Sequence, residues 1–429
     1  MMKLVPSMFK SYTTKSEPKT TITDPKIVRQ LNKAAILRAV LANVEGISRA
    51  GAARITSLSR ATVSAIVEEL IEARILREVG LAASHGGRPP TLLQLNPDSG
   101  RAVGVDIGAT HLSAVVANLR GRTLAEAEIA FDIRRGPEVG LEQVKSLVEE
   151  TVTAANCTLA EVTGVGVGVP GPVIMTQGKV SSPPIMPGWD EFPIRERLEA
   201  WWGRPTSLDN DANLGALGEW AYGGGQGESN LVYIKVGTGI GCGILIDGKI
   251  YHGVLGTAGE IGHLTTSQDG PPCKCGNYGC LEAMAGGEAI AQRAQLAVKA
   301  GQRTSLAEVS GQRPITARDV TEAAQAGDVV ARQLLNDAGW HIGSALASVI
   351  NFLNPGLVLV GGGVTGAGDF ILSPISEAVE QRCLRASFQA TRIELAKLGR
   401  QSVALGAVSL ALTKAFQGLV ESGEALGAG

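Results

Sequence analysis

One histidine and three cysteines stand close together in the middle of the chain. They follow the pattern H-x9-C-x-C-x4-C and are His263, Cys273, Cys275 and Cys280. Three thiolates and one imidazole complete a tetrahedral Zn²⁺ site with no open position, so a metal held here would be structural. Gly276 and Gly279 permit the sharp bend that such close ligands require. Chance clustering of buried cysteines is the alternative, but the spacing favours zinc.

The composition is that of a globular protein with more than one core. The chain has 429 residues, of which 44% are hydrophobic and 19% charged, enough for one small and one large domain. It contains no run of about 18 apolar residues and no apolar signal core near its start. We therefore expect a cytoplasmic protein that does not interact with a membrane.

Charge is distributed unevenly along the sequence. Residues 1–60 hold 11 Lys and Arg against 3 Asp and Glu, whereas the remaining residues hold 28 against 38. A basic segment on an acidic body attracts phosphates locally and limits non-specific binding elsewhere. A solvated basic tail would produce the same imbalance, so the charge alone does not decide between the two interpretations.

Helical periodicity follows this basic start. We predict a first helix over about 32–42, a short helix capped by Ser48 that ends near residue 55, and a third helix capped by Ser59. Val63, Ile66 and Val67 begin an apolar stripe on the third helix. Residues 75–79 and 91–95 alternate as a two-stranded wing would, with Arg88 at its tip.

This order predicts a winged helix-turn-helix that binds operator DNA, because the first turn of a second helix after a tight turn can reach base edges and phosphates. A protein-interaction module with the same stripes is the alternative. The candidate DNA-contacting residues are basic or carry hydroxyl groups, and they are Arg49, Ser59, Arg60, Thr62, Ser64 and Arg88.

From residue 101 the pattern changes to short strands. Strands are expected at 102–106, 112–117 and 123–131, then a helix over about 138–156 and a strand at 162–169. This order is typical of an actin-like kinase lobe, and a second lobe is predicted to begin near Asn230. Two lobes predict a cleft between them, where a ligand would bind.

Three glycine-rich turns follow predicted strands in this part: DIGATH (106–111), VGTGIGCG (236–243) and VGGGVTGAG (360–368). Their backbone N–H groups could surround phosphates, although a single such turn is more often structural. The candidate nucleotide-binding residues, if that activity is retained, are Asp106, Gly108, Thr110, Gly237, Thr238, Gly239, Gly361, Gly362 and Gly363.

The stretch from Ser48 to Leu76, the GGRPPTLLQLNP segment that begins at Gly86, the three glycine turns and the zinc pattern together resemble the ROK family of repressors, open-reading-frame proteins and kinases. The resemblance runs from about Ile36 to Phe416. It departs from the family at Ser57 and Arg74, where the family usually has glycine. At both places a residue other than glycine makes a left-handed backbone conformation less favourable.

The resemblance implies an α/β fold class: an N-terminal winged helix-turn-helix plus a two-lobed actin-like ATPase (ribonuclease H-like) sugar kinase fold with a structural zinc. The expected divisions are a basic tail over 1–25, the DNA-binding domain over 26–97, the effector domain over 101–416 and a C-terminal tail over 417–429. Paired recognition helices would read paired half-sites, so a homodimer or homotetramer is expected.

The segments GVPGPV, LDNDANLGALGEW and GTAGEIGH look like the sugar site of the family. Carried over residue by residue, the groups that would bind a monosaccharide are Asn210, Asp211, Glu260, His263 and Glu282. In kinases of the family the aspartate at the position of Asp211 is the base. Asn210 also suits a helix N-cap, and the two roles are compatible. Loss of zinc should weaken the sugar response, because His263 belongs to both sets.

Two functions compete for this sequence. In the first, a monosaccharide effector changes the DNA affinity of a transcription repressor of carbohydrate genes, although activation is equally compatible with the residues. In the second, the protein is a sugar kinase that uses ATP and Mg²⁺, with Asp211 as its base. Ala109 and His111 replace the glycine and lysine usual in the first phosphate loop of the kinases, which favours the regulator.

Overall fold

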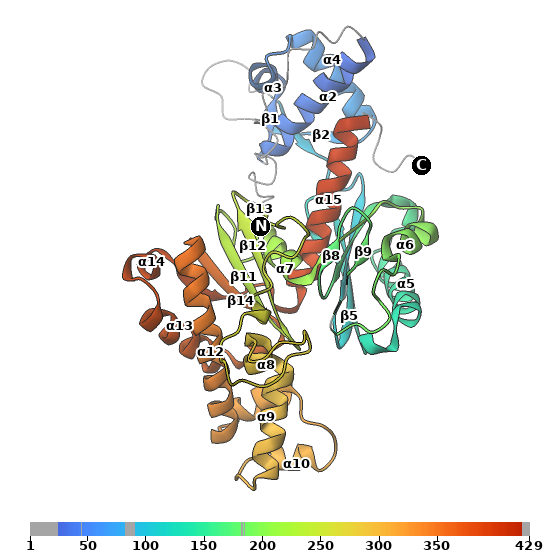
Figure 1. The fold of residues 1–429 in the computed structure, drawn as a ribbon. Helices are drawn as coiled ribbons and strands as arrows, with labels where there is room; N and C mark the ends of the chain where they lie inside the picture. Colours follow the sequence, from blue (N-terminus) through green and yellow to red (C-terminus); the bar gives the residue numbers. More distant parts are fainter. Residues whose placement is uncertain (1–24, 44, 82–90, 182, 184, 423–429) are drawn as a thin grey trace.

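The computed structural model describes residues 25–43, 45–81, 91–181, 183 and 185–422. An N-terminal unit of residues 25–97 stands at one end, and two larger α/β lobes lie side by side below it (Figure 1). No helix among these described residues is long and apolar enough to cross a membrane.

The described residues of the N-terminal unit form three helices and a small antiparallel sheet. Its strands lie in the order β1-β3-β2, and the short β1 pairs with β3 through Ile47 opposite Leu93. Two residues are too few to give a strand signal, so β1 was not predicted. The elements are α2 (Pro25–Ala42), β1 (Ile47–Ser48), α3 (Arg49–Thr56), α4 (Arg60–Glu72), β2 (Leu76–Leu81) and β3 (Thr91–Leu95).

The predicted helix starts are confirmed for α3 and α4. Ser48 accepts a hydrogen bond from the Gly51 backbone N–H, and Ser59 accepts one from the Thr62 backbone N–H. The prediction for α2 was wrong at its start, because the helix begins at Pro25 and not near residue 32. Its polar first half is held by ion pairs of Arg29 and Lys33 with Glu69 on α4, which a search for apolar spacing does not detect.

Two residues of this unit adopt the left-handed backbone that favours glycine. Ser57, between α3 and α4, has φ 58°, and Arg74, after α4, has φ 59°. These are the two positions at which the resemblance to the ROK family lacked its usual glycine. The turn geometry is therefore kept by residues that adopt it at some cost in free energy.

The first lobe is a five-stranded mixed sheet in the order β10-β7-β4-β5-β6. The predicted strands and helix are confirmed within a few residues. The elements are β4 (Arg101–Ile107), β5 (His111–Asn118), β6 (Thr123–Ala130), α5 (Pro137–Ala154), β7 (Val162–Val169), β8 (Val173–Ile174), β9 (Lys179–Val180), α6 (Ile194–Trp202) and β10 (Thr206–Asn210), with one-turn helices η1 (Ile133–Arg135) and η2 (Leu159–Glu161).

The second lobe is another five-stranded sheet, in the order β13-β12-β11-β14-β15. Its elements are β11 (Leu231–Val236), β12 (Ile240–Ile246), β13 (Lys249–Ile250), η3 (Ile261–His263), α8 (Leu281–Ala285), α9 (Gly287–Lys299), α10 (Leu306–Ser310), α11 (Ala317–Gln325), α12 (Val329–Leu353), β14 (Leu357–Gly361), η4 (Gly363–Ala367), α13 (Asp369–Arg382), α14 (Arg385–Ala390), β15 (Arg392–Leu395) and η5 (Gly399–Gln401).

Two helices, α7 (Asp211–Tyr222) and α15 (Ser402–Ser422), pack against each other between the lobes (Figure 1): α7 contacts β11 and β12 of the second sheet, and α15 contacts β4 and β7 of the first. They approach so closely that a side chain on Gly218 would meet the Ser402 carbonyl oxygen at 2.0 Å, so this position requires glycine. Beyond the lobes α15 continues to α2 of the N-terminal unit (Figure 1). Phe416 near its end is buried in one apolar core with Ile36 and Leu37.

Candidate functional site

The histidine and three cysteines predicted to bind a metal come together in the second lobe. One ligand atom from each of His263, Cys273, Cys275 and Cys280 lies within 4.8 Å of all the others. The Cys275 and Cys280 sulfurs are 3.7 Å apart, and His263 Nδ1 is 3.7 Å from the Cys273 sulfur. Sulfurs about 2.3 Å from a tetrahedral metal ion would stand about 3.8 Å apart. The four side chains therefore fit a four-coordinate metal ion.

His263 connects this cluster to the carboxylates of the predicted sugar set. Its Nδ1 faces the cysteines, whereas its Nε2 is 4.0 Å from a carboxylate oxygen of Glu260. Burial raises the pKa of Glu260; His263 opposes this, and the nearby charges of Asp211 and Glu282 add to it. Four of the five predicted sugar-set residues are thus close enough to influence one another.

Glu282 ties the metal motif to the second glycine turn. It lies on α8, two residues after Cys280, and its Oε2 accepts a hydrogen bond of 3.1 Å from the Ile240 backbone N–H. A side chain on Gly239 would meet the same oxygen at 2.0 Å, so glycine is needed for this carboxylate to fit. One oxygen of Glu282 is therefore used within the protein, which leaves the other for a ligand.

Asn210 and Asp211 stand at the start of α7. The Asn210 side chain caps the helix by accepting hydrogen bonds from the backbone N–H groups of Ala212 and Asn213, and it donates one to the Gly171 carbonyl at 3.0 Å. The predicted N-cap is confirmed. Asp211 accepts a hydrogen bond of 2.7 Å from the ammonium of Lys235 on β11. Lys235 was not among the predicted site residues, although it is the single charged residue in an otherwise apolar strand.

In the first glycine turn, the His111 side chain lies against Asp106 and Gly108 of the same turn. His111 folds back so that its Nε2 is 3.1 Å from Asp106 Oδ2, and a side chain on Gly108 would meet the imidazole at 2.3 Å. Thr110 at the tip is exposed. Burial opposes the charged form of Asp106, but Lys235 and His111 outweigh it and lower its pKa.

The other two glycine turns lie at one edge of the second sheet, because β11 and β14 are parallel and Lys235 pairs with Gly361. Gly361 and Gly362 are needed structurally, since a side chain would meet Tyr233 Oη at 2.3 Å in one case and the Val236 carbonyl at 2.4 Å in the other. Gly237 and Gly363 face open space. The Thr238 carbonyl accepts from the Glu288 backbone N–H on α9.

The predicted DNA-contacting residues differ in their exposure and in the contacts they make within the protein. Arg49 donates to Glu68 at 2.9 Å and to Glu78 at 3.1 Å, so it joins α3 to α4 and β2. The Ser59 hydroxyl oxygen accepts a hydrogen bond from the Thr62 backbone N–H, and the Ser59 and Thr62 hydroxyl groups are 2.9 Å apart. Arg60 is exposed, and Ser64 is half-buried. Arg88 lies outside the described residues.

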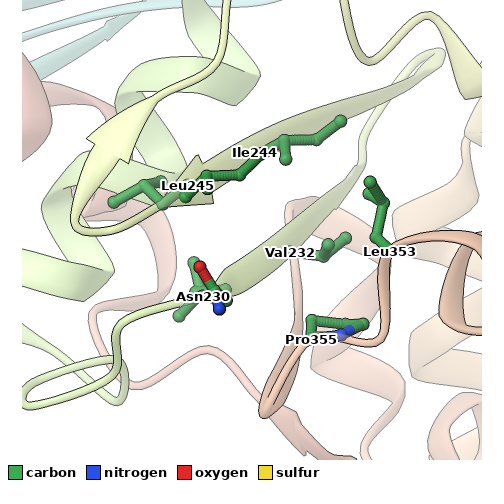
Figure 2. Close-up of a pocket in the computed structure, with 8 residues that line it drawn as sticks. Asn230, Val232, Ile244, Leu245, Leu353 and Pro355 are labelled. Carbon is green, nitrogen blue, oxygen red and sulfur yellow. The ribbon is translucent and has the colours of Figure 1, made fainter. Parts of the chain in front are cut away.

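A small apolar hollow exists away from these groups (Figure 2). It is lined by backbone and side chains that include Asn230, Val232, Ile244 and Leu353. The hollow lies at the start of β11 and the end of β12, where Leu353 ends α12, whereas Lys235 and the glycine turn lie at the opposite end of β11. The hollow is therefore separate from the group formed by Asp106, Asp211 and Glu260.

Known proteins resemble the chain over most of its length. The ROK family matches residues 102–414. The xylose repressor of Caldicellulosiruptor bescii is 33% identical over 387 residues, 90% of this chain and 96% of that protein. A crystal structure of a ROK family transcriptional regulator, a homolog of the E. coli Mlc protein, matches with a TM-score of 0.77 at 27% identity, covering 94% of this chain and all of the other.

A kinase of the same fold matches a smaller share. The ROK family glucokinase from Streptomyces griseus, in complex with glucose and AMPPNP, has a TM-score of 0.65 at 31% identity and covers 73% of this chain and 99% of its own. The N-terminal unit precedes the part that the family matches. The two α/β lobes thus have the actin-like sugar kinase fold, and the chain belongs to the ROK family.

Proposed function

We propose that the chain is a sugar-responsive, DNA-binding transcription repressor. The observation that carries this proposal is the extent of the match to the xylose repressor, which spans 90% of this chain, whereas the glucokinase structure covers 73%. The additional part includes α3 and α4, which a sugar kinase does not need. The domains follow as 26–97 for DNA binding and 101–416 for the effector, with tails at 1–25 and 417–429.

The N-terminal unit would bind operator DNA as a winged helix-turn-helix. Its α4 begins with the exposed Arg60, whereas Glu68, Glu69 and Glu72 follow toward its other end. Only the first turn of α4 therefore offers a favourable surface to phosphates. Thr62 and Ser64 could bond base edges or backbone, while Arg49 supports α4 through its ion pairs.

The cleft would bind a monosaccharide, with a structural Zn²⁺ beside it. Carboxylates of Asp211, Glu260 and Glu282 can each accept hydrogen bonds from neighbouring hydroxyls. Zinc suits three thiolates and one imidazole and leaves no open position for chemistry. Through His263 the metal would hold the Glu260 side of the site in place. The effector would be a neutral sugar, since this part of the cleft is lined by acidic groups.

Helix α15 provides a physical route from the cleft to the DNA-binding end. At its start Ser402 donates to the fully buried Glu219 of α7 at 2.8 Å, and the backbone N–H groups of residues 397 and 398 donate to the same carboxylate. At its other end Phe416 is buried against the N-terminal unit. A change in lobe angle would move α15 and with it the recognition helix of each protomer in a dimer or tetramer.

The kinase alternative is favoured by the preserved Asp211 and by the glucokinase match. Purified, zinc-loaded protein should be mixed with ATP, Mg²⁺ and a panel of hexoses, pentoses and amino sugars, and titrated with the same sugars by calorimetry. A repressor binds one sugar and releases no sugar phosphate. Steady formation of sugar phosphate that is lost in Asp211→Asn would support the kinase instead.

A further inference from the structure

Lys235 is a lysine inside a strand whose other residues are all apolar. The strand β11 reads LVYIKV, and its remaining five residues are buried. The Lys235 side chain is 16% exposed and that of its partner Asp211 is 13% exposed. Withdrawing an ammonium this far from water is costly unless the surroundings repay it. The packing of the sheet does not explain why a lysine lies at this position.

Two carboxylates from different elements surround this ammonium. Asp211, at the start of α7, accepts its hydrogen bond at 2.7 Å. Asp106, at the end of β4, interacts with it electrostatically, and its buried Oδ1 has no hydrogen-bond partner among the described residues. Burial works against the charged form of Lys235, but Asp211 and Asp106 outweigh it and raise its pKa. The ammonium is thus a fixed positive charge where the two lobes meet.

We propose that Lys235 is a positioning residue that fixes the Asp211 carboxylate as an acceptor for an effector hydroxyl. The inference rests on the proposed function of the cleft. Oδ2 of Asp211 is committed to Lys235, which leaves Oδ1 to accept from a neutral sugar.

Affinity for sugar separates positioning from a merely structural role. We would titrate D-xylose and D-glucose into zinc-loaded wild type, Lys235→Met, Asp211→Asn and the double variant. Each single substitution should weaken binding at least about tenfold, and the double variant should be no weaker than Asp211→Asn by more than about twofold, because the two residues act as one unit. Lys235→Arg should recover part of the loss, and Lys249→Met on the exposed β13 should change nothing.

A folded Lys235→Met protein with wild-type sugar affinity would overturn the inference, as would losses that multiply in the double variant. Thermal unfolding of every variant identifies any protein that has not folded. Lys235→Arg then provides the comparison if Lys235→Met is unfolded: an Arg variant that binds as wild type supports positioning by charge, and one that binds as weakly as Asp211→Asn contradicts it.

Lysine acylation tests the same contact without any sugar. Acetic anhydride reacts with the neutral amine, so Lys235 should be acetylated at least about tenfold more slowly than Lys249 in the wild type. Asp211→Asn should raise the rate at Lys235 at least about threefold, measured by mass spectrometry of peptides. An unchanged rate would show that Asp211 does not hold the ammonium. A wild type that binds neither sugar would count against the proposed function alone, because this experiment still decides the role of the pair.

Discussion

The first turns of α4 and α7 are built alike and surrounded differently. Each is capped by a polar side chain, Ser59 in α4 and Asn210 in α7. The start of α4 is exposed and carries Arg60. The start of α7 is enclosed, and its Asp211 is bound to Lys235 and lies near Glu260.

The difference fits the two ligands of the proposed function. An exposed, basic helix start can approach a large polyanion whose phosphates remain partly in water. An enclosed, acidic start with its carboxylates held in place suits a small neutral molecule with several hydroxyls. At one end of α15, Ser402 donates to Glu219 of α7, and at the other end Phe416 is buried in a core shared with the N-terminal unit. The proposed function uses this series of contacts to connect the two regions.

The largest effect should come from removing a proposed metal ligand beside the enclosed site. Cys280→Ser should release the metal, lower the unfolding temperature by at least about 5 °C and weaken sugar binding more than tenfold, since His263 would no longer be held. Metal analysis, thermal unfolding and calorimetry measure the three quantities. Cys157→Ser is the control, because Cys157 lies outside the cluster. Retained metal and affinity in Cys280→Ser would contradict the assigned ligand set.

Removing the exposed cation at α4 should affect DNA alone. Arg60→Ala should weaken binding to promoter DNA about tenfold and reduce the dependence of log affinity on log salt concentration by about one. Sugar affinity should stay within about twofold of wild type. Arg318→Ala, an exposed arginine on α11, is the matched control and should leave DNA binding unchanged. Equal losses in both variants would indicate a general charge effect.

Within the cleft, the two sides should differ in their response to substitution. Glu260→Gln should weaken sugar binding by about tenfold, because the carboxylate accepts stronger hydrogen bonds than an amide. Thr110→Ala, at the exposed tip of the first glycine turn, should change it by less than about twofold. Calorimetry with one sugar compares the two. A larger loss in Thr110→Ala would show that the ligand lies on the glycine-turn side.

The smallest effect concerns the turn that orients α4. Ser57→Gly should stabilise the protein by about 0.5 to 1 kcal/mol, because glycine adopts φ 58° without the penalty of a side chain. Ser59→Gly at the neighbouring cap provides the opposite sign, since it removes the side-chain bond to Thr62. Urea unfolding measures both. A destabilised Ser57→Gly protein would mean that the serine side chain has a role that its backbone angle does not reveal.

Local signals in the sequence were sufficient for much of this architecture. Caps such as Ser48 and Ser59, the apolar stripe from Val63 and the spacing of the metal ligands each involve residues near one another in the chain. Contacts between distant elements could not be predicted. Lys235 meets Asp211 from a strand 24 positions away, and this depends on how the lobes face each other. The fold of His111 onto Asp106 depends on a loop conformation that residue types do not specify.

The most direct test of the account is the affinity of the protein for DNA with and without sugar. Fluorescence anisotropy with a labelled fragment from upstream of its own gene would be measured on zinc-loaded wild type and on Asp211→Asn. Saturating amounts of the sugar identified by calorimetry should change the wild-type Kd at least about tenfold, or about 1.4 kcal/mol of coupling, and should leave that of Asp211→Asn unchanged at the same concentration. Identical DNA affinity of the wild type in both conditions would contradict the claim that the cleft controls the DNA-binding end.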